Sequence, residues 1–241
     1  MAGYDVAARV ASIQEKIDAA CQRSGRDTSE VAIMAVTKFQ PVQAIQAAWD
    51  AGLRLFGESR VLEAAEKFKT LRETQIIGAA CGTAMELHLV GSLQRNKAKT
   101  AAALFDCIQS VDRESLIDTL GSLTIERESP LMILLEYHTG EETKAGFSCR
   151  DSLYRAAERL LSFPGLKPSG LMTMAPFTDD TAAVRRAFRE LTSARDELVK
   201  RFPSESWSCL SMGMTGDFEI AIEEGSTMIR IGTALFGERG T

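Results

Sequence analysis

Lys38 follows an apolar run, "VAIMAV" at residues 31–36, and precedes Pro41. The run predicts a short buried strand and the proline disfavours its continuation, so the lysine marks the carboxyl end of that strand. A lysine in this position either lays its stem on the core with its ammonium in water, or presents a desolvated amine to a carbonyl compound. An amine of the second kind forms a Schiff base, and the residue alone leaves both interpretations open.

Two turns near the carboxyl end of the sequence combine glycine with hydroxyl residues. They are "SMGMTGD" at 211–217 and "RIGTALFG" at 230–237, each after an apolar run. Backbone N–H groups in such turns, together with the dipole of a following helix, favour an anion such as phosphate. The alternative is that the glycines only permit tight turns. The candidate phosphate contacts are Ser211, Gly213, Met214, Thr215, Gly216, Gly232 and Thr233.

Apolar runs of strand length alternate with helical patterns along the sequence, after an N-terminal helix at about residues 4–24. Eight such runs recur at intervals of roughly 25–35 residues, which predicts a single-domain α/β protein over residues 1–241, folded as a closed parallel (β/α)8 barrel of the TIM type. A doubly wound open sheet is the alternative, and the pattern alone distinguishes the two poorly. The eight runs are 31–38, 53–58, 87–92, 107–112, 131–137, 165–174, 207–212 and 227–232.

Three local features of the sequence lead to further predictions about its secondary structure. Asp112 is placed to cap the helix "RESLIDTL" that follows it. The stretch "DFEIAIEEG" at 217–225 alternates apolar and polar residues, so a strand is not excluded there. The stretch "RETQIIGAACGTAMEL" at 72–87 is too long for a tight turn and predicts an irregular excursion.

The composition excludes several classes of protein. The net charge of −5 argues against a broad nucleic-acid surface, because phosphate backbones need a basic face. No apolar stretch reaches membrane-spanning length, and the first residues lack the pattern of a signal peptide. Five scattered cysteines without a C-x-x-C motif indicate free thiols in a reducing compartment, and two histidines cannot form a three-histidine zinc centre. We therefore expect a cytoplasmic, soluble protein with no metal, nucleic-acid or membrane partner.

A barrel of this kind would bring the reactive groups together. Such groups gather at the carboxyl ends of the strands, and the loops after strands seven and eight are the usual phosphate site. Lys38 on the first strand would then lie across the seam of the barrel from the two glycine-containing turns. A ligand with an aldehyde near one end and a phosphate at the other fits this arrangement, and pyridoxal 5′-phosphate (PLP) is such a molecule.

Seven stretches of the sequence resemble, in order and spacing, the YggS-like pyridoxal phosphate homeostasis proteins. The resemblance implies a barrel like the N-terminal domain of alanine racemase, with PLP held as a Schiff base on Lys38. It also implies that Arg230 faces the pyridine nitrogen, and that Ser211, Thr215, Gly232 and Thr233 hold the phosphate. The stretches lie within about residues 31–239 and read "AVTK", "AGLRLFGE", "LHLVGSLQRNK", "IQSVDR", "ETKAGF", "GLMTMAP" and "LSMGMTGDFEIAIEEGSTMIRIGTALFGER".

Two positions depart from the pattern of that family. The family usually reads "FGEN" where this chain has "FGES", so Ser59 replaces an asparagine near the cofactor. His138 stands where the loop before "ETKAGF" usually has an asparagine. Lys144 in that loop is a second amine that could accept PLP transiently if Lys38 were lost. Two lysines of "QRNKAK" are expected to be solvated, Lys97 and Lys99.

Arg230 bears on the mechanism through its own chemistry. A guanidinium stays protonated, so it donates to the ring nitrogen of PLP but accepts no proton from it. The ring nitrogen then stays unprotonated and the cofactor is a weaker electron sink, which handicaps carbanion chemistry. The alternative is a structural arginine that caps the strand or pairs with Glu58 or Asp217.

Three functions remain open. The first is a protein that holds PLP for intracellular homeostasis and hands it to apo-enzymes with little or no turnover; the family suggests a monomer. The second is a PLP-dependent amino-acid racemase, which needs an acid–base group on the opposite face of the ring, and lacking that group typically costs about 10²–10⁴-fold. Of Tyr4, Tyr137 and Tyr154, only Tyr137 is plausibly placed for this role. The third is a class I aldolase in which Lys38 binds a phosphorylated sugar and Glu58 is the acid–base group. Because a racemase would depend on Tyr137 alone for its second acid–base group, we favour the first function.

Overall fold

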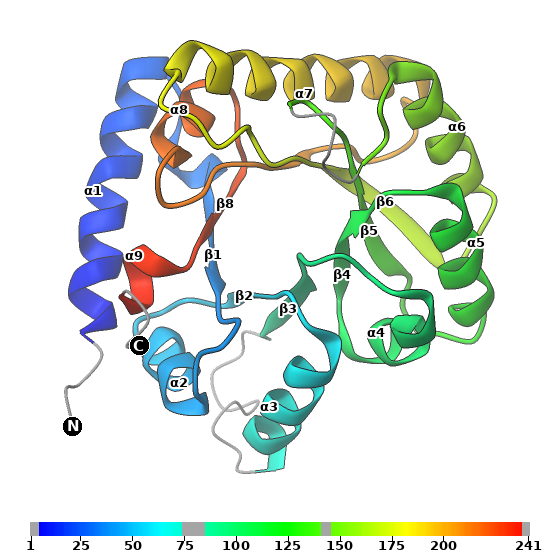
Figure 1. Ribbon diagram of the computed structural model, residues 1–241, viewed down its shortest axis with the longest axis horizontal. Helices are drawn as coiled ribbons and strands as arrows, with labels where there is room; N and C mark the ends of the chain where they lie inside the picture. Colours follow the sequence, from blue (N-terminus) through cyan, green and yellow to red (C-terminus); the bar gives the residue numbers. More distant parts are fainter. Residues whose placement is uncertain (1–4, 74–84, 141–145, 238–241) are drawn as a thin grey trace.

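The computed structural model describes residues 5–73, 85–140 and 146–237. Eight parallel strands pair in sequence order, and β1 also pairs with β8, which closes the sheet into a barrel (Figure 1). The predicted (β/α)8 barrel is therefore confirmed, and an open doubly wound sheet is ruled out. The strands are β1 (Ala32–Val36), β2 (Leu55–Glu58), β3 (Glu86–Leu89), β4 (Cys107–Val111), β5 (Leu131–Glu136), β6 (Leu166–Met172), β7 (Cys209–Ser211) and β8 (Met228–Ile231).

Helices surround the strands, with α1 along one side of the barrel and α7 across the next (Figure 1). The first helix begins where Asp5 accepts a hydrogen bond from the N–H of Ala8, and it ends at Gly25, whose φ of 67° is left-handed. In the ranges described, no helix is long and apolar enough to cross a bilayer. The helices are α1 (Val6–Ser24), α2 (Val42–Asp50), α3 (Val61–Glu73), α4 (Ala98–Leu104), α5 (Glu114–Leu123), α6 (Arg150–Leu161), α7 (Thr181–Arg201), α8 (Phe218–Glu223) and α9 (Thr233–Phe236).

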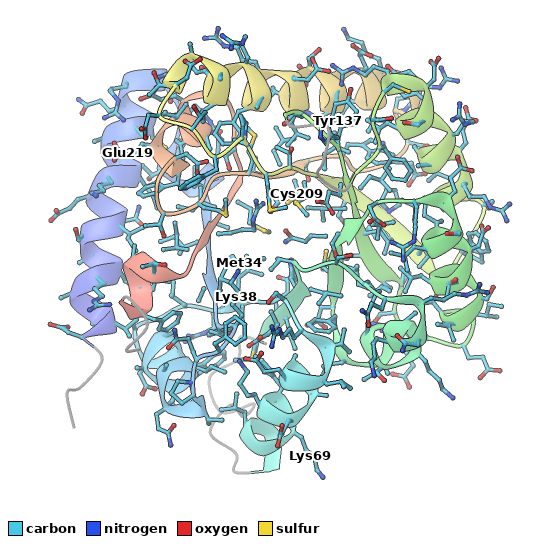
Figure 2. All side chains as sticks on the ribbon, in the orientation of Figure 1. Met34, Lys38, Lys69, Tyr137, Cys209 and Glu219 are labelled. Carbon is cyan, nitrogen blue, oxygen red and sulfur yellow. The ribbon has the colours of Figure 1, made fainter. Side chains whose placement is uncertain are left out.

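Side chains along each strand alternate between two apolar layers. The larger layer lies between the strands and the helices and includes Phe56 and Leu210. Figure 2 shows Met34 and Cys209 in the middle of the ring of strands. The interior of the barrel therefore has its own small apolar cluster, separate from the helix-facing core. Its members are Cys107, Leu134 and Met172, with Met132 and Cys209 packed against them.

Helix α8 occupies the stretch where a strand was not excluded. Its buried residues Phe218, Ala221 and Ile222 are spaced three and one apart. That spacing places the three residues on one helical face. Burial of this face against the barrel favours a helix over the strand that the alternating pattern allowed.

The helix cap predicted at Asp112 is wrong. The residue that precedes α5 is Arg113, which makes no side-chain cap, so Asp112 stands one position too early. Its Oδ1 instead accepts from the Arg113 guanidinium at 2.5 Å. The predicted excursion at 72–87 lies mostly outside the described residues.

Gly170 of β6 permits a close approach that a side chain would block. Its φ is 152°, and a Cβ atom there would lie 1.8 Å from the carbonyl oxygen of Cys209 on β7. The pairing of β5 with β6 also shifts register here, between Ile133 and Leu134. We expect Gly170→Ala to lower the free energy of unfolding by about 2 kcal/mol, because the strands must move apart.

Chemical denaturation measures this effect. Gly216→Ala is the matched control, since a Cβ at Gly216 would meet nothing within 4 Å. Equal stability of the two variants would contradict the account of β6.

Candidate functional site

The carboxyl ends of β8 and β1 meet at the seam of the barrel. Ile231 of β8 pairs with Ala35 of β1. A Cβ atom on Gly232 would lie 3.6 Å from the carbonyl oxygen of Val36. The turn after β8 therefore lies against the end of β1, two residues before Lys38. We call this end of the barrel, where the carboxyl ends of the strands gather, the barrel mouth.

Lys38 lies just past β1, with an exposed side chain (Figure 2). Within the described ranges its amine makes no hydrogen bond and no ion pair. The amine is therefore not desolvated, which contradicts that part of the second interpretation of this lysine. An unpaired amine at the barrel mouth is nevertheless open to an incoming carbonyl compound.

Glu58, the acid–base candidate of the aldolase hypothesis, is engaged with helix α3. Its Oε1 lies 2.6 Å from the Nζ of Lys67 and accepts from the Oγ1 of Thr37 at 2.8 Å. Burial raises the pKa of Glu58, and the hydrogen bonds from Lys67 and Thr37 offset part of that shift. Phe56, two residues earlier on β2, packs in the helix-facing layer. Glu58 therefore faces away from the barrel interior and is paired there with Lys67, not with Arg230.

Arg230 points into the barrel from β8 and is 5% exposed. Its Nη1 donates to the carbonyl oxygen of Ser211 at 2.7 Å and to the hydroxyl of Ser211 at 2.8 Å. Its Nη2 donates to the carbonyl oxygen of Thr173 at 2.8 Å. A guanidinium has five N–H groups, so the Nε–H and one Nη2–H have no acceptor among the described residues. Burial lowers the pKa of Arg230 to about 10, against the charges of Asp217 and Glu136, so the side chain is protonated at neutral pH.

A chain of hydrogen bonds continues from Arg230 through the barrel interior. The hydroxyl of Ser211 donates to Oε1 of Gln109 at 2.6 Å. The Nε2 of Gln109 lies 2.7 Å from Nδ1 of His88, and Nε2 of His88 lies 2.8 Å from Oε1 of Glu86. Because Ser211 is fully buried and its hydroxyl belongs to this chain, its contact with a phosphate stays a prediction.

Glu136, at the end of β5, is a carboxyl at the barrel mouth that sequence reasoning missed. Leu134, two residues earlier, packs inside the barrel, so Glu136 faces the interior as well. The residue is 4% exposed, and its carboxyl makes no hydrogen bond in the part of the chain described. Burial raises the pKa of Glu136 to about 7, the charge of Asp112 adds to this and the charge of Arg230 opposes it. Alternation with Leu134 was the signal in the sequence that could have revealed it.

The turn after β7 offers fewer donors than predicted. The N–H of Met214 donates to Oδ1 of Asp217 at 2.6 Å, so this donor is occupied. Thr215 and Gly216 are exposed. The hydroxyls of Thr215 and Thr233 have no partner among the residues described. These two hydroxyls, the backbone N–H groups of Thr215 and Gly216, and the first N–H groups of α9 remain candidate donors to an anion.

The other predicted residues lie at separate places on the barrel. Ser59 is half-buried after β2, and its hydroxyl has no partner within the described ranges. His138 is half-buried after β5. Lys97 is half-buried at the start of α4, and Lys99 is exposed on that helix. Lys144 lies outside the described residues.

The tyrosines that the structure describes face the surrounding helices. The hydroxyl of Tyr137 donates to Oε1 of Glu190 at 3.1 Å, and that of Tyr154 donates to Oε2 of Glu197. Both glutamates belong to α7. Tyr137 is therefore not available at the barrel mouth as the acid–base partner of a racemase, and Tyr4 lies outside the described residues.

The chain is similar to known proteins over nearly its whole length. A family model described as the N-terminal domain of alanine racemase matches residues 9–240. The pyridoxal phosphate homeostasis protein of Aquifex aeolicus is 36% identical over 232 residues, which are 96% of this chain and 97% of that protein. The corresponding protein of Vibrio cholerae is 38% identical over 228 residues, 94% of this chain and 93% of its own length. The chain belongs to the family of pyridoxal phosphate homeostasis proteins, as the resemblance in its sequence indicated.

A solved structure of the same size is also similar. PipY of Synechococcus elongatus PCC7942, determined with PLP bound, superposes with a TM-score of 0.81 at 33% identity. The match covers 97% of this chain and all of PipY, 100% of its length. The likeness therefore extends over the whole barrel.

Proposed function

We propose that this chain is a single-domain PLP-binding protein that acts in PLP homeostasis with little or no turnover, holding the cofactor as a Schiff base on Lys38. The observation that carries the proposal is the exposed Lys38 amine, which has no partner in the described part of the chain and lies across the β1–β8 seam from the turn after β8. The names of the relatives and the PLP bound to PipY support it. Cytoplasmic location, a monomeric state and PLP-requiring apo-enzymes as recipients belong to the same proposal.

The side chains at the barrel mouth fit the three functional groups of PLP. Bound PLP supplies an aldehyde for Schiff-base chemistry and a pyridine ring that acts as an electron sink. Lys38 offers an unpaired amine to the aldehyde. Arg230 keeps two N–H donors that have no acceptor among the described residues, which suits a pyridine nitrogen as acceptor. Thr215 and Thr233 offer hydroxyls that have no partner in the ranges described, while Ser59, Ser211, Met214 and Gly232 remain predicted contacts of the phosphate or the cofactor.

Three features favour a carrier over an enzyme. Arg230 keeps its proton at neutral pH, so it can donate to the ring nitrogen without protonating it. Tyr137 and Tyr154 donate to α7 and leave the barrel mouth without a described tyrosine. Glu58 is paired with Lys67 on the helix side of the sheet, so the carboxyl assigned to the aldolase hypothesis does not face the barrel mouth.

Amino-acid racemisation is the second candidate because of Glu136. This buried carboxyl faces the barrel interior, and its pKa of about 7 suits proton transfer near neutral pH. A racemase of this kind would use Lys38 and Glu136 to move protons at the substrate carbon.

A transfer assay separates the two functions. We expect PLP-loaded wild-type protein to reactivate a PLP-requiring apo-enzyme, and Lys38→Ala to lose this ability, because its PLP is no longer retained through gel filtration. Amino acids added to the loaded wild type should undergo D/L conversion no faster than with free PLP. Conversion that requires Lys38 and is lost in Glu136→Gln would instead identify a racemase.

A further inference from the structure

The ammonium of Lys67 on α3 lies behind the turn that carries Lys38. Its Nζ donates to the carbonyl oxygen of Thr37 at 2.7 Å and lies 3.4 Å from that of Gln40. The same Nζ lies 2.6 Å from Oε1 of Glu58 and 2.9 Å from Oε1 of Glu63. One cation therefore joins the turn after β1 to β2 and to its own helix.

The backbone of this turn is held at further points. The N–H of Phe39 donates to Oε1 of Glu63 at 2.5 Å, and the N–H of Gln40 donates to the carbonyl oxygen of Thr37 at 3.0 Å. Phe39 has a φ of 62° and is the only non-glycine residue with positive φ among those described. Residues other than glycine rarely adopt this backbone conformation, and it persists where the surrounding structure enforces it.

The Lys67–Glu58 pair is largely removed from water. The Lys67 side chain is 11% exposed and that of Glu58 is 0% exposed. Solvent and salt screen such a pair much less than a surface pair, and losing one partner leaves an uncompensated buried charge. The pair is thus a fixed point against which the turn is held.

We propose that Lys67 is a positioning residue for Lys38: by holding the carbonyl of Thr37, it fixes the turn and the direction in which the Lys38 side chain leaves the backbone. This inference rests on the proposed function, in which Lys38 attaches PLP. Neither Lys67 nor Glu58 needs to touch the cofactor. Their effect on it passes through the backbone between Thr37 and Gln40.

Two variants separate positioning from a loss of stability. Lys67→Met removes the ammonium but leaves the Glu58 carboxyl buried without its cation. Lys67→Met combined with Glu58→Gln removes that charge as well, keeps an acceptor for Thr37, and still lacks the donor to the Thr37 carbonyl. Lys69→Met is the control, because Lys69 is an exposed lysine of the same helix, away from the barrel mouth (Figure 2).

Three measurements follow the turn and the cofactor separately. In protein without PLP, we expect amide exchange at Phe39 and Gln40 to accelerate about tenfold or more in both Lys67 variants. The association constant for PLP should fall about tenfold, because the amine is no longer held in place. At saturating PLP, the visible circular dichroism per bound PLP should also drop in the double variant, which a loss of stability alone would not cause. Lys69→Met should change each quantity by less than about twofold.

Two results would overturn the positioning role of Lys67. A double variant within about twofold of wild type in exchange and PLP binding would overturn it. Recovery of PLP binding on adding Glu58→Gln would also overturn it, since the buried charge and not the turn would then have mattered. If the wild type attaches no PLP to Lys38, the proposed function fails, and amide exchange alone still decides whether Lys67 holds the turn.

Discussion

Arg230→Met is expected to lower the free energy of unfolding by about 3 kcal/mol or more. Arg230 is 5% exposed, and its guanidinium donates to Ser211 twice and to the carbonyl oxygen of Thr173. Methionine fills a similar length but donates nothing, so these buried acceptors lose their partner. The hydrogen-bond chain through Gln109 and His88 also loses its end. Urea denaturation of the protein without PLP measures this loss.

Arg189→Met is the matched control for this prediction. The Arg189 side chain is 66% exposed and pairs with Glu224 at 2.7 Å. The Glu224 side chain is 9% exposed but keeps its bond from Arg185 at 2.7 Å, so losing the exposed Arg189 side chain should change the free energy of unfolding by no more than about 1 kcal/mol. If both arginine variants lost equal stability, Arg230 would not be the buried anchor described here.

Glu136→Gln is expected to flatten the dependence of stability on pH between about 4.5 and 7. The pKa of Glu136 is raised from an ordinary 4.5 to about 7, by burial first and by the charge of Asp112 next, against the charge of Arg230. In this window the folded chain holds a proton that the unfolded chain has released. Wild-type stability from this group is therefore fully present below pH 4.5 and is lost as the pH rises towards 7.

Glutamine carries no such proton, so the stability of the variant relative to wild type should rise over the same window. A raised pKa of this size corresponds to about 3 kcal/mol. Denaturation at a series of pH values measures the difference. Parallel stability profiles for the wild type and Glu136→Gln would contradict the burial of this carboxyl.

Glu223→Gln provides a control of opposite sign. Burial raises the pKa of Glu223, but the hydrogen bonds from Arg185 and Arg23 outweigh it and hold that pKa below its usual range. Wild-type stability from this carboxylate is present near neutral pH and is lost on acidification. The Glu223 variant should therefore lose its disadvantage at low pH, whereas the Glu136 variant should gain its advantage at high pH.

The barrel and the place of Lys38 were predictable because both depend on order along the chain. Eight apolar runs separated by helical patterns imply a parallel sheet, and closure of that sheet brings the ends of β1 and β8 together. Lys38 follows the first of these strands directly. No knowledge of side-chain packing was needed for that inference.

The groups around Lys38 were not predictable in the same way. Lys67 reaches the carbonyl of Thr37 from 30 residues away, which depends on how α3 rotates against β1 and β2. The bond between Ser211 and Gln109 joins residues 102 positions apart across the barrel interior. Asp112 illustrates the smaller error, because a helix that begins one residue later turns a predicted cap into a partner of Arg113.

The measurement that tests the central claim most directly is borohydride reduction of the PLP-incubated protein, followed by absorbance spectroscopy and peptide mass mapping. The Schiff base proposed on Lys38 predicts a visible band that disappears on reduction and a pyridoxyl mass on the peptide that contains Lys38. Lys38→Ala should lack both. No chromophore after incubation with PLP, or a wild-type adduct only on another lysine such as Lys97 or Lys144, would contradict it.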